Sequence, residues 1–253
     1  IVIPKLVKDT HGNAISEIID KNGNKRYVRL LSWVSGRLWS NVNPKSAKLK
    51  YSLGETAGKI TKTLFNFKDP KSDYKFDWDI AQSLWTKQYL HLFSSKQQTM
   101  IMHFQKQFEA AQPTYTKLRK SIVHNDVNDN NILVSEDLIQ PKVKSIIDFG
   151  DAIYTQTIND LAIACAYAIM HHNEPLEAAS HIIKGYHKSF PIKQEELYHL
   201  YICIAMRLVI SVTKSAINKT KEPENNYLLI SEKPAWALIK KWFHITPEFA
   251  LYS

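Results

Sequence analysis

A short polar segment near the middle of the chain has residue types and spacings that suit the transfer of a phosphoryl group. The stretch HNDVNDNNIL begins at His124, and it contains Asp126 two positions later and Asn131 five positions after that Asp. The stretch IDFGDA places Asp148 in an Asp-Phe-Gly triplet after an apolar run. Neither motif is specific alone. Together, in this order and with β-like apolar runs between them, they form the signature of a catalytic loop followed by a metal-binding loop.

The chemistry of phosphoryl transfer explains these residue types. Such a reaction depends on positioning and on charge neutralisation more than on covalent help from the protein. Asp126 fits a carboxylate that accepts the proton of the attacking hydroxyl, and His124 is expected to stabilise this catalytic loop. Mg²⁺ prefers hard oxygen ligands, which Asn131 and Asp148 supply. The competing interpretation is a surface β-hairpin in which Asn and Asp only form turns.

Four more polar residues are candidates for contacts with an acceptor substrate. Asn128 and Asp129 lie on the same loop, where they either shape the acceptor site or hydrogen-bond within the loop. Asp151 follows the Asp-Phe-Gly triplet and could contact a metal or the substrate, or cap a turn. Arg207 stands in an apolar helical stretch and requires a carboxylate partner, either within the fold or on an amino-acid substrate.

The elements around this segment change character along the chain. Residues 1–35 are predicted to form strands, with a hairpin at the Asn22-Gly23 pair. Apolar residues then recur every three or four positions, as on a helix face. Helices are predicted for residues 46–66, 96–119, 159–171, 175–188, 194–218 and 234–242. A polar loop is predicted for residues 219–226, and the fold class is α+β.

Composition narrows the class of protein. The 253 residues are 44% apolar and 23% charged, as in an ordinary globular protein. The net charge of +9 is spread along the chain, so it supports a nucleotide ligand weakly and nucleic acid less. Cys165 and Cys203 lie in apolar runs and are expected to be buried. Because no Cys-x-x-Cys pair is present, a Cys-rich zinc site is excluded. We find no membrane span or signal peptide and expect a cytoplasmic protein.

The chain resembles the aminoglycoside phosphotransferase and choline kinase superfamily (the APH family). It is most similar to the hydroxylysine kinase-like branch, which includes phosphotransferase domains fused to class III aminotransferases. The resemblance covers nearly the whole chain. It is carried by HNDVNDNNIL, by IDFGDA, by VRLLSWVSG at residues 28–36, by Trp78-Asp79 and by YLLISEKPAWAL at residues 227–238.

This resemblance implies a protein-kinase-like fold of two lobes, with Asp126 as catalytic base, Asn131 and Asp148 as Mg²⁺ ligands, and ATP or GTP as phosphoryl donor. Asp160 would support the loops from inside. The resemblance also implies a hinge between the lobes whose backbone binds the nucleobase. The hinge residues would be Ser32, Trp33 and Val34.

Two departures from the family pattern affect these expectations. Asn125 stands where the family usually has Gly, which is tolerable if the backbone dihedral angles there are ordinary. The chain also contains no G-x-G-x-x-G motif and no strand lysine of the kind that anchors phosphates. We therefore expect residues 1–35 to be a remnant of the N-terminal β lobe and hinge, and residues 36–253 to be a mostly helical catalytic C-terminal lobe. Activity of this piece alone is left open.

The leading hypothesis is a small-molecule kinase, a transferase that phosphorylates a hydroxyl of an amino alcohol or hydroxy amino acid. Hydroxylysine, homoserine, choline and aminoglycosides all remain possible acceptors. The alternative is a non-catalytic, kinase-like binding or regulatory module attached to an aminotransferase. The sequence leaves open the exact acceptor, the choice between ATP and GTP, and the oligomeric state.

Overall fold

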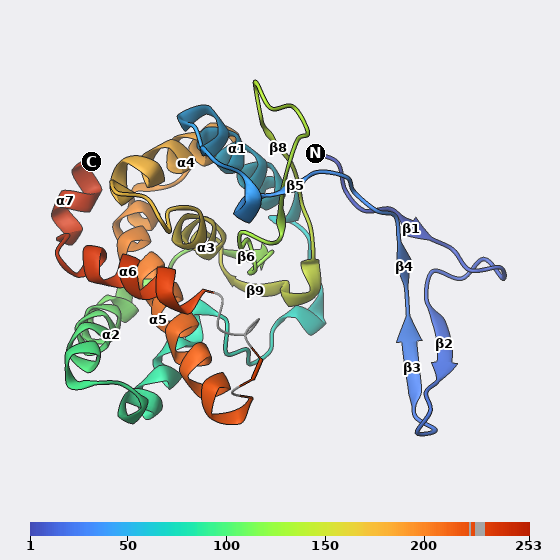
Figure 1. The fold of residues 1–253 in the computed structure, drawn as a ribbon, viewed down its shortest axis with the longest axis horizontal. Coiled ribbons are helices and arrows are strands. Elements are labelled where there is room, and N and C mark those ends of the chain that lie inside the picture. Colours follow the sequence, from blue (N-terminus) through green and yellow to red (C-terminus); the bar gives the residue numbers. More distant parts are fainter. Residues whose placement is uncertain (223, 226–230) are drawn as a thin grey trace.

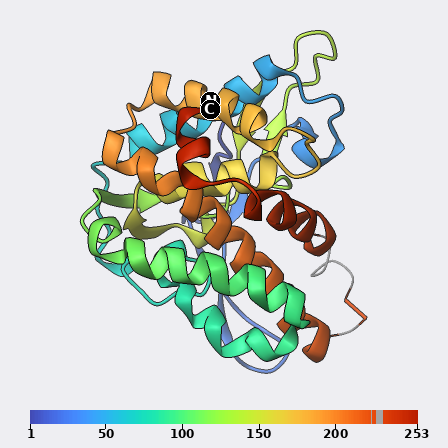
Figure 2. The ribbon, with the colours of Figure 1, turned by 90° about the vertical axis from the view of Figure 1, so that its left-hand side faces the viewer.

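An extended arm projects from a helical body in the computed structural model of this chain (Figure 1). The structure describes residues 1–222, 224–225 and 231–253. Residues 1–35 form what we call the N-terminal arm, and the helices gather in the remainder of the chain, the body. In the view turned by 90°, the arm lies behind the helices of the body (Figure 2).

The N-terminal arm is a pair of narrow two-stranded ribbons. The predicted Asn-Gly hairpin is confirmed, since Gly23 at the turn has a φ of 79°, a conformation that favours glycine. The predicted strand over residues 26–34 is instead broken at Arg29, because its two halves pair antiparallel with different partners. The pairs are β1 (Leu6–Val7) with β4 (Leu30–Leu31), and β2 (Ser16–Ile19) with β3 (Lys25–Val28).

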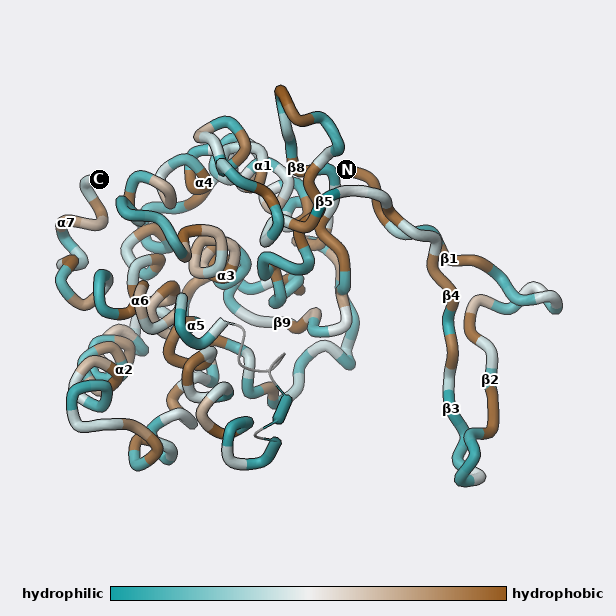
Figure 3. Tube along the Cα trace, viewed as in Figure 1, coloured by the Kyte–Doolittle hydropathy of each residue, from teal (hydrophilic) through white to brown (hydrophobic). Residues whose placement is uncertain are grey.

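Many apolar side chains of the arm face solvent. A ribbon of two strands has no second layer to cover it, so Ile19, Tyr27 and Leu30 are exposed. The brown segments along the arm in Figure 3 show the same pattern. The arm is tied to the body near β8 (Val143–Ile146), where the Val2 amide donates to the Lys144 carbonyl at 3.2 Å. The ends of the arm therefore lie beside the strand that leads to Asp148.

Two small antiparallel sheets in the body frame the polar segment. One has the order β5-β7-β8, and its β7–β8 hairpin confirms the two predicted strands between Asn131 and Asp148. The other pairs β6 with β9 and was not predicted. The bounds are β5 (Arg37–Leu38), β6 (Lys120–Val123), β7 (Ile132–Val134) and β9 (Ile153–Gln156).

The six predicted helices are confirmed with shifted ends. They are α1 (Ala47–Leu64), α2 (Ser95–Tyr115), α3 (Ile158–Ala168), α4 (Pro175–Ser189), α5 (Gln194–Lys221) and α6 (Glu232–Phe243). Part of the loop predicted for residues 219–226 is helical, because α5 continues to Lys221, and residues 223 and 226 lie outside the described part. A short last helix and four 3-10 segments were not predicted. They are α7 (Pro247–Tyr252), η1 (Trp39–Asn41), η2 (Pro70–Ser72), η3 (Ile80–Leu92) and η4 (Phe149–Asp151).

The core is centred on α3 and α5. Every residue of α3 is buried, and α5 packs against α2, α3, α6 and η3. By length and composition alone, α5 is apolar enough to cross a membrane, but 83% of its most apolar window is buried inside the fold. The apolar sequence of α5 is therefore accounted for by its place as the central core helix. Both cysteines are buried in this core, as expected.

Helices α1 and α4 cross at unusually close range. A Cβ added at Gly185 would lie 2.0 Å from the Tyr51 carbonyl oxygen, and one at Gly54 would lie 1.9 Å from the Ile182 carbonyl oxygen. Only glycine permits such an approach of two backbones. The contact fixes the position of α1, which lines the cleft described below.

Candidate active site

Helix α3 holds the beginning of the HNDVNDNNIL segment in place through Asp160. Asp160 lies in the first turn of this helix and is buried, and its carboxylate accepts hydrogen bonds from the backbone N–H groups of His124 (3.0 Å) and Asn125 (2.8 Å). Burial raises the pKa of this carboxyl group, while the nearby His124 and these two hydrogen bonds oppose the shift. Asp160 thus supports the loop from inside, as the resemblance implied.

Asn125 adopts a backbone conformation that most residues avoid. Its φ is 65°, in the left-handed region, so the condition of ordinary dihedral angles that was set for tolerating Asn at this position is not met. Asn tolerates this region better than other residues with a Cβ. The conformation therefore explains both the glycine that is usual in the family and the Asn found here. Its buried side-chain amide has no hydrogen-bond partner among the described residues.

His124 joins the catalytic loop to the Asp-Phe-Gly segment. Its Nδ1 accepts from the Asp126 backbone N–H at 3.2 Å, and its Nε2 therefore carries the proton and donates to the Ile147 carbonyl at 3.0 Å. Its ring also packs against Phe149, with the two centroids 4.4 Å apart. These contacts give His124 the loop-stabilising role expected for it.

Asp126 lies at the centre of a converging set of donors. Its Oδ2 accepts hydrogen bonds from the side-chain amides of Asn131 (2.8 Å) and Asn128 (2.9 Å). Its Oδ1 accepts one from Arg207 at 3.2 Å. Together, these three donors hold the carboxylate in one orientation. The side chain remains 23% exposed, so an acceptor hydroxyl could still reach it.

Arg207 pairs with a carboxylate within the fold, that of Asp126, which was one of the two alternatives predicted for it. Its side chain is only 1% exposed, and besides Asp126 it donates to the Trp78 carbonyl oxygen at 2.7 Å. Its guanidinium carbon lies 4.8 Å from the Trp78 ring centroid and 5.5 Å from that of Tyr167. The Arg207 side chain therefore supports Asp126 from within the fold, which argues against a direct contact between Arg207 and the substrate.

Trp78 and Asp79, which are part of the resemblance to the family, join several elements at the base of the site. The Trp78 carbonyl and ring hold Arg207, as described. The Asp79 carboxylate is buried, caps η3 through the Ala81 amide (3.1 Å) and accepts from the Thr155 hydroxyl on β9 (2.9 Å). Burial raises the pKa of Asp79. The pair thus connects η3, β9 and α5 around the base of the site.

Asn131 and Asp148 are brought together by the β7–β8 hairpin. The Ile147 amide donates to the Asn131 carbonyl at 2.9 Å, which sets Asp148 beside the end of the catalytic loop. The Asn131 side-chain nitrogen bonds to Asp126, so its amide oxygen is the atom left for a cation. One carboxylate oxygen of Asp148 accepts a hydrogen bond from the Gly150 amide at 3.2 Å, which leaves the other carboxylate oxygen for a cation.

This donor set fits Mg²⁺ completed by phosphate oxygens. No group of three or more His, Cys, Asp or Glu side chains placed to hold a metal occurs in the described part of the chain. Mg²⁺ typically binds proteins through one or two carboxylates plus substrate phosphates and water, and does not need such a cluster. One carboxylate and one amide oxygen are therefore a sufficient protein contribution.

A large, mainly apolar cleft lies between the arm and the body. Its volume is about 780 Å³, and Asp148 and Phe149 lie among its lining residues. The other lining residues include Leu31, Val34, Leu38, Ile60, Leu64, Leu133 and Ile147. An apolar slot of this kind, with a metal-binding carboxylate beside it, suits a nucleobase followed by phosphates.

The three predicted hinge residues all line this cleft but differ in their availability. The Ser32 backbone N–H donates to the Lys5 carbonyl at 2.8 Å, and the Ser32 hydroxyl accepts from the Lys5 amide at 2.9 Å. The N–H of Ser32 is thus committed within the arm. Trp33 is 91% exposed, and Val34 is buried. Trp33 and Val34 are therefore the better candidates for contacts with a nucleobase.

A second, polar hollow of about 230 Å³ has Asp126 in its lining. It brings together Asp126, Asn128, Asp129 and Asp151, four of the residues predicted from the sequence. Burial raises the pKa of both Asp129 and Asp151, and neighbouring carboxylates add to the effect. An acidic hollow beside the candidate base suits an acceptor that carries an ammonium group.

Sequence reasoning missed the wall that α5 contributes to this hollow. Ser211, Lys214 and Asn218 line it together with Trp78 and Tyr167. The positions 207, 211, 214 and 218 share one face of a helix, so the helical period around Arg207 was the signal that would have found them. Tyr227 to Ile230 of the family-like tail lie outside the described residues.

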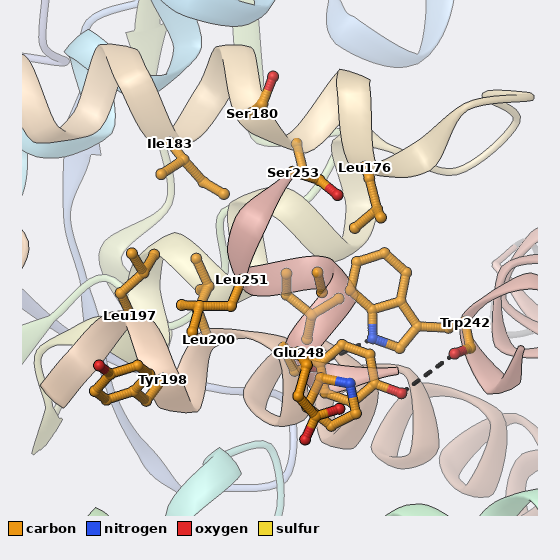
Figure 4. A pocket seen from close by; sticks show the side chains of 15 residues that line it. Leu176, Ser180, Ile183, Leu197, Tyr198, Leu200, Trp242, Glu248, Leu251 and Ser253 are labelled. Atoms are coloured by element: carbon orange, nitrogen blue, oxygen red, sulfur yellow. Dashed lines mark hydrogen bonds between the residues drawn. The ribbon is translucent and has the colours of Figure 1, made fainter. Parts of the chain in front are cut away.

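Another hollow, remote from these residues in the fold, is shown in Figure 4. It has a volume of about 180 Å³ and lies between α4, α5 and α7, with lining residues such as Leu176, Ile183 and Trp242. None of the motif residues lines it. Its lining is mostly aliphatic, and Glu248 is the one charged side chain among the described residues that line it. The hollow therefore lacks the polar groups that phosphoryl transfer requires.

Comparisons with known proteins identify the family of this chain. A family model described as the phosphotransferase enzyme family matches residues 7–195. The hydroxylysine kinase of Bos taurus is 27% identical over 250 residues, a match that covers 92% of this chain and 66% of that protein. The chain thus spans about two thirds of the length of the curated hydroxylysine kinases it matches.

Two solved structures resemble this one. A microcompartment-associated aminopropanol kinase has a TM-score of 0.72 at 16% identity, with 96% of this chain and 76% of that chain covered. Amicoumacin kinase in complex with AMP-PNP, Ca²⁺ and Ami has a TM-score of 0.67 at 17% identity, with 98% and 75% covered. These likenesses confirm the expected α+β, protein-kinase-like fold.

Proposed function

This chain belongs to the phosphotransferase enzyme family, and on that basis we propose that the protein transfers the γ-phosphoryl group of a nucleoside triphosphate to a hydroxyl of a small, amine-bearing acceptor. The observation that carries the proposal is the position of Asp126. This carboxylate lines an acidic hollow that suits an amine, and it accepts a hydrogen bond from Asn131. The β7–β8 hairpin connects Asn131 to Asp148, which lines the apolar cleft that suits a nucleotide. The similarity to hydroxylysine kinases favours a hydroxy amino acid or amino alcohol as the acceptor.

Asp126 would act on the acceptor hydroxyl. The hydroxyl donates a hydrogen bond to an Asp126 carboxylate oxygen, and this oxygen takes the proton as the hydroxyl oxygen attacks the γ-phosphorus. Asn128, Asn131 and Arg207 keep the carboxylate oriented during this step, because each of them donates to one of its oxygens. This orientation is the main contribution of the loop, since phosphoryl transfer depends largely on positioning.

Asn131 and Asp148 would hold Mg²⁺ against the phosphates. The ion, when bound, would neutralise charge on the phosphoryl oxygens and align the donor with the acceptor. The Asp148 backbone has a φ of 67°, and its side chain is fixed by the Gly150 amide, so the ligand is oriented by the loop itself. The donor would be ATP or GTP, since the apolar lining of the cleft accepts either base.

A panel of alcohols tests the proposal. With Mg-ATP and Mg-GTP, the full-length protein should consume nucleotide in the presence of hydroxylysine, homoserine, choline or an aminoglycoside, but not without an acceptor. Asp126→Asn should lower kcat by about 100-fold or more, because the general base is lost. Asp73→Asn, an exposed position that lines neither hollow, is the matched control. Turnover by Asp126→Asn at the parental rate would refute the assignment of the base.

The alternative of a silent module that serves a fused or associated aminotransferase predicts no turnover with any acceptor. The same panel therefore separates the two hypotheses. A protein without phosphoryl transfer has no physical need to keep an amide and a carboxylate oriented beside Asp126, and this argument favours the kinase. Association with an aminotransferase is compatible with an active kinase and is tested by whether the two copurify.

A further inference from the structure

We propose that Lys214 forms a subsite for the carboxylate of the acceptor, so that the protein selects hydroxy amino acids over amino alcohols that lack a carboxylate. The inference rests on the kinase function proposed above and identifies its substrate class. It concerns a residue on α5 that the motifs do not include. Three features of the acidic hollow carry it: the place of Lys214 in the wall, the charges around it and the weakness of its present contacts.

Lys214 lies on the face of α5 that borders the hollow. It is seven residues beyond Arg207, or about 10 Å along the helix axis at 1.5 Å per residue. Arg207 contacts Asp126, where the hydroxyl reacts. Ser211 lies between the two positions and also lines the hollow. Lys214 therefore stands where the far end of a short acceptor would lie when its hydroxyl is against Asp126.

The charges of the hollow match a zwitterion. Asp126, Asp129 and Asp151 contribute three carboxylates to its lining, and Lys214 is the one cationic side chain among the described residues that line it. The acidic side suits an ammonium group, and Lys214 suits a carboxylate. An amino alcohol would use the acidic side alone, and Lys214 would then have no ligand group to bind.

The present contacts of Lys214 are easily exchanged. Its ammonium nitrogen lies 2.6 Å from a carboxylate oxygen of Asp77, whose side chain is 62% exposed, and 4.9 Å from the Trp85 ring centroid. The Lys214 side chain is itself 22% exposed, so the pair lies at the protein surface, where an ion pair adds little to stability. Lys214 can therefore turn to a substrate carboxylate at low cost while the Trp85 ring keeps the side chain near the hollow.

Arg207, the other cation near the hollow, is not available for this role. Its guanidinium is buried, and it is already bonded to Asp126 and to the Trp78 carbonyl oxygen. Because its side chain is only 1% exposed, a substrate carboxylate in the hollow has little access to it. Lys214 has no such commitment, so it is the better partner.

Matched pairs of acceptors test the proposal in the full-length protein. Each pair is a hydroxy amino acid and the amine left when its carboxylate is removed: homoserine with aminopropanol, and hydroxylysine with its decarboxylated diamine. In Lys214→Met, we expect KM for the amino acids to rise about tenfold, the value of one charge-assisted hydrogen bond in a partly exposed site, with kcat nearly unchanged. KM for the decarboxylated partners should not change.

Two further variants separate charge from architecture. Lys214→Arg keeps the positive charge and should restore most of the affinity for the amino acids. Asp77→Asn removes the ion pair but keeps the lysine, so KM for the amino acids should stay the same or fall. A purely structural role for Lys214 would instead make Lys214→Met and Asp77→Asn alike and would affect both members of each acceptor pair.

The outcomes distinguish this inference from the function on which it rests. If no acceptor is turned over by the parent, both the kinase function and the carboxylate subsite are refuted. If the parent turns over the amines as efficiently as the amino acids, or if Lys214→Met changes KM for both to the same extent, the subsite alone is refuted. A selective rise in KM for the amino acids supports it.

Discussion

The ion pair between Arg207 and Asp126 should show strong thermodynamic coupling. Replacement of Arg207 by Met keeps an apolar chain between Trp78 and Tyr167 but removes the bond to Asp126 and the bond to the Trp78 carbonyl oxygen. A hydrogen bond to a charged group contributes about 1.5–3 kcal/mol, and a neutral one about 1 kcal/mol. Since Asp126 is partly exposed, water would recover part of this loss for the carboxylate.

We therefore expect Arg207→Met to lower the free energy of unfolding by about 2–3 kcal/mol, less than the loss of a fully buried ion pair. For a domain of this size, the unfolding midpoint should fall by very roughly 5–10 °C. Denaturant unfolding of the parent, Arg207→Met, Asp126→Asn and the double variant forms a double-mutant cycle. The coupling energy between the two residues should be about 1 kcal/mol or more. Additive effects, with a coupling near zero, would refute the view that Arg207 holds the candidate base in place.

Three other positions give sharp tests. Asn125→Ala should be less stable than Asn125→Gly by about 1–2 kcal/mol in denaturant unfolding, because both variants lose the amide but only Ala has a Cβ at positive φ; equal stabilities would contradict the left-handed backbone. Gly185→Ala should lower the unfolding free energy by about 2 kcal/mol or more, since its Cβ would meet the Tyr51 carbonyl, whereas the exposed Lys184→Ala on the same helix should change little. Burial raises the pKa of Asp129 above its ordinary value of 3.8. At a pH above 3.8, ionisation of this carboxyl group therefore opposes folding. Asp129→Asn should therefore gain stability over the parent at neutral pH, and this gain should shrink as the pH falls toward 3.8; a gain that does not vary with pH would contradict the shift.

The convergence of the candidate base and the candidate metal ligands could be predicted from the sequence because the information is local. Asp126, Asn131 and Asp148 lie within one strand-loop-hairpin unit, and the apolar runs between them show how the chain returns to the same point. Helices such as α1 and α4 were equally visible, since their buried residues recur every three or four positions. Fold class and candidate site therefore followed from short-range patterns.

The features that were missed depend on contacts between distant segments. The pairing of β6 with β9 joins residues 30 or more positions apart, and the sequence KSIV alone gives no sign of its partner. The carboxylate that pairs with Arg207 lies 81 positions away, so the sequence could only indicate that one was required. α7 has six residues, too few for a helical period to be recognised.

The central claim is that Asn131 and Asp148 hold a cation beside Asp126, and metal-dependent nucleotide binding tests it most directly. Titration calorimetry of the full-length protein with ATP or GTP should show much tighter binding with Mg²⁺ than without it. In Asp148→Asn, this dependence on Mg²⁺ should be largely lost, because the one carboxylate ligand becomes a neutral amide. If Asp148→Asn binds the nucleotide with the same dependence on Mg²⁺ as the parent, the cation lies elsewhere and the account is contradicted.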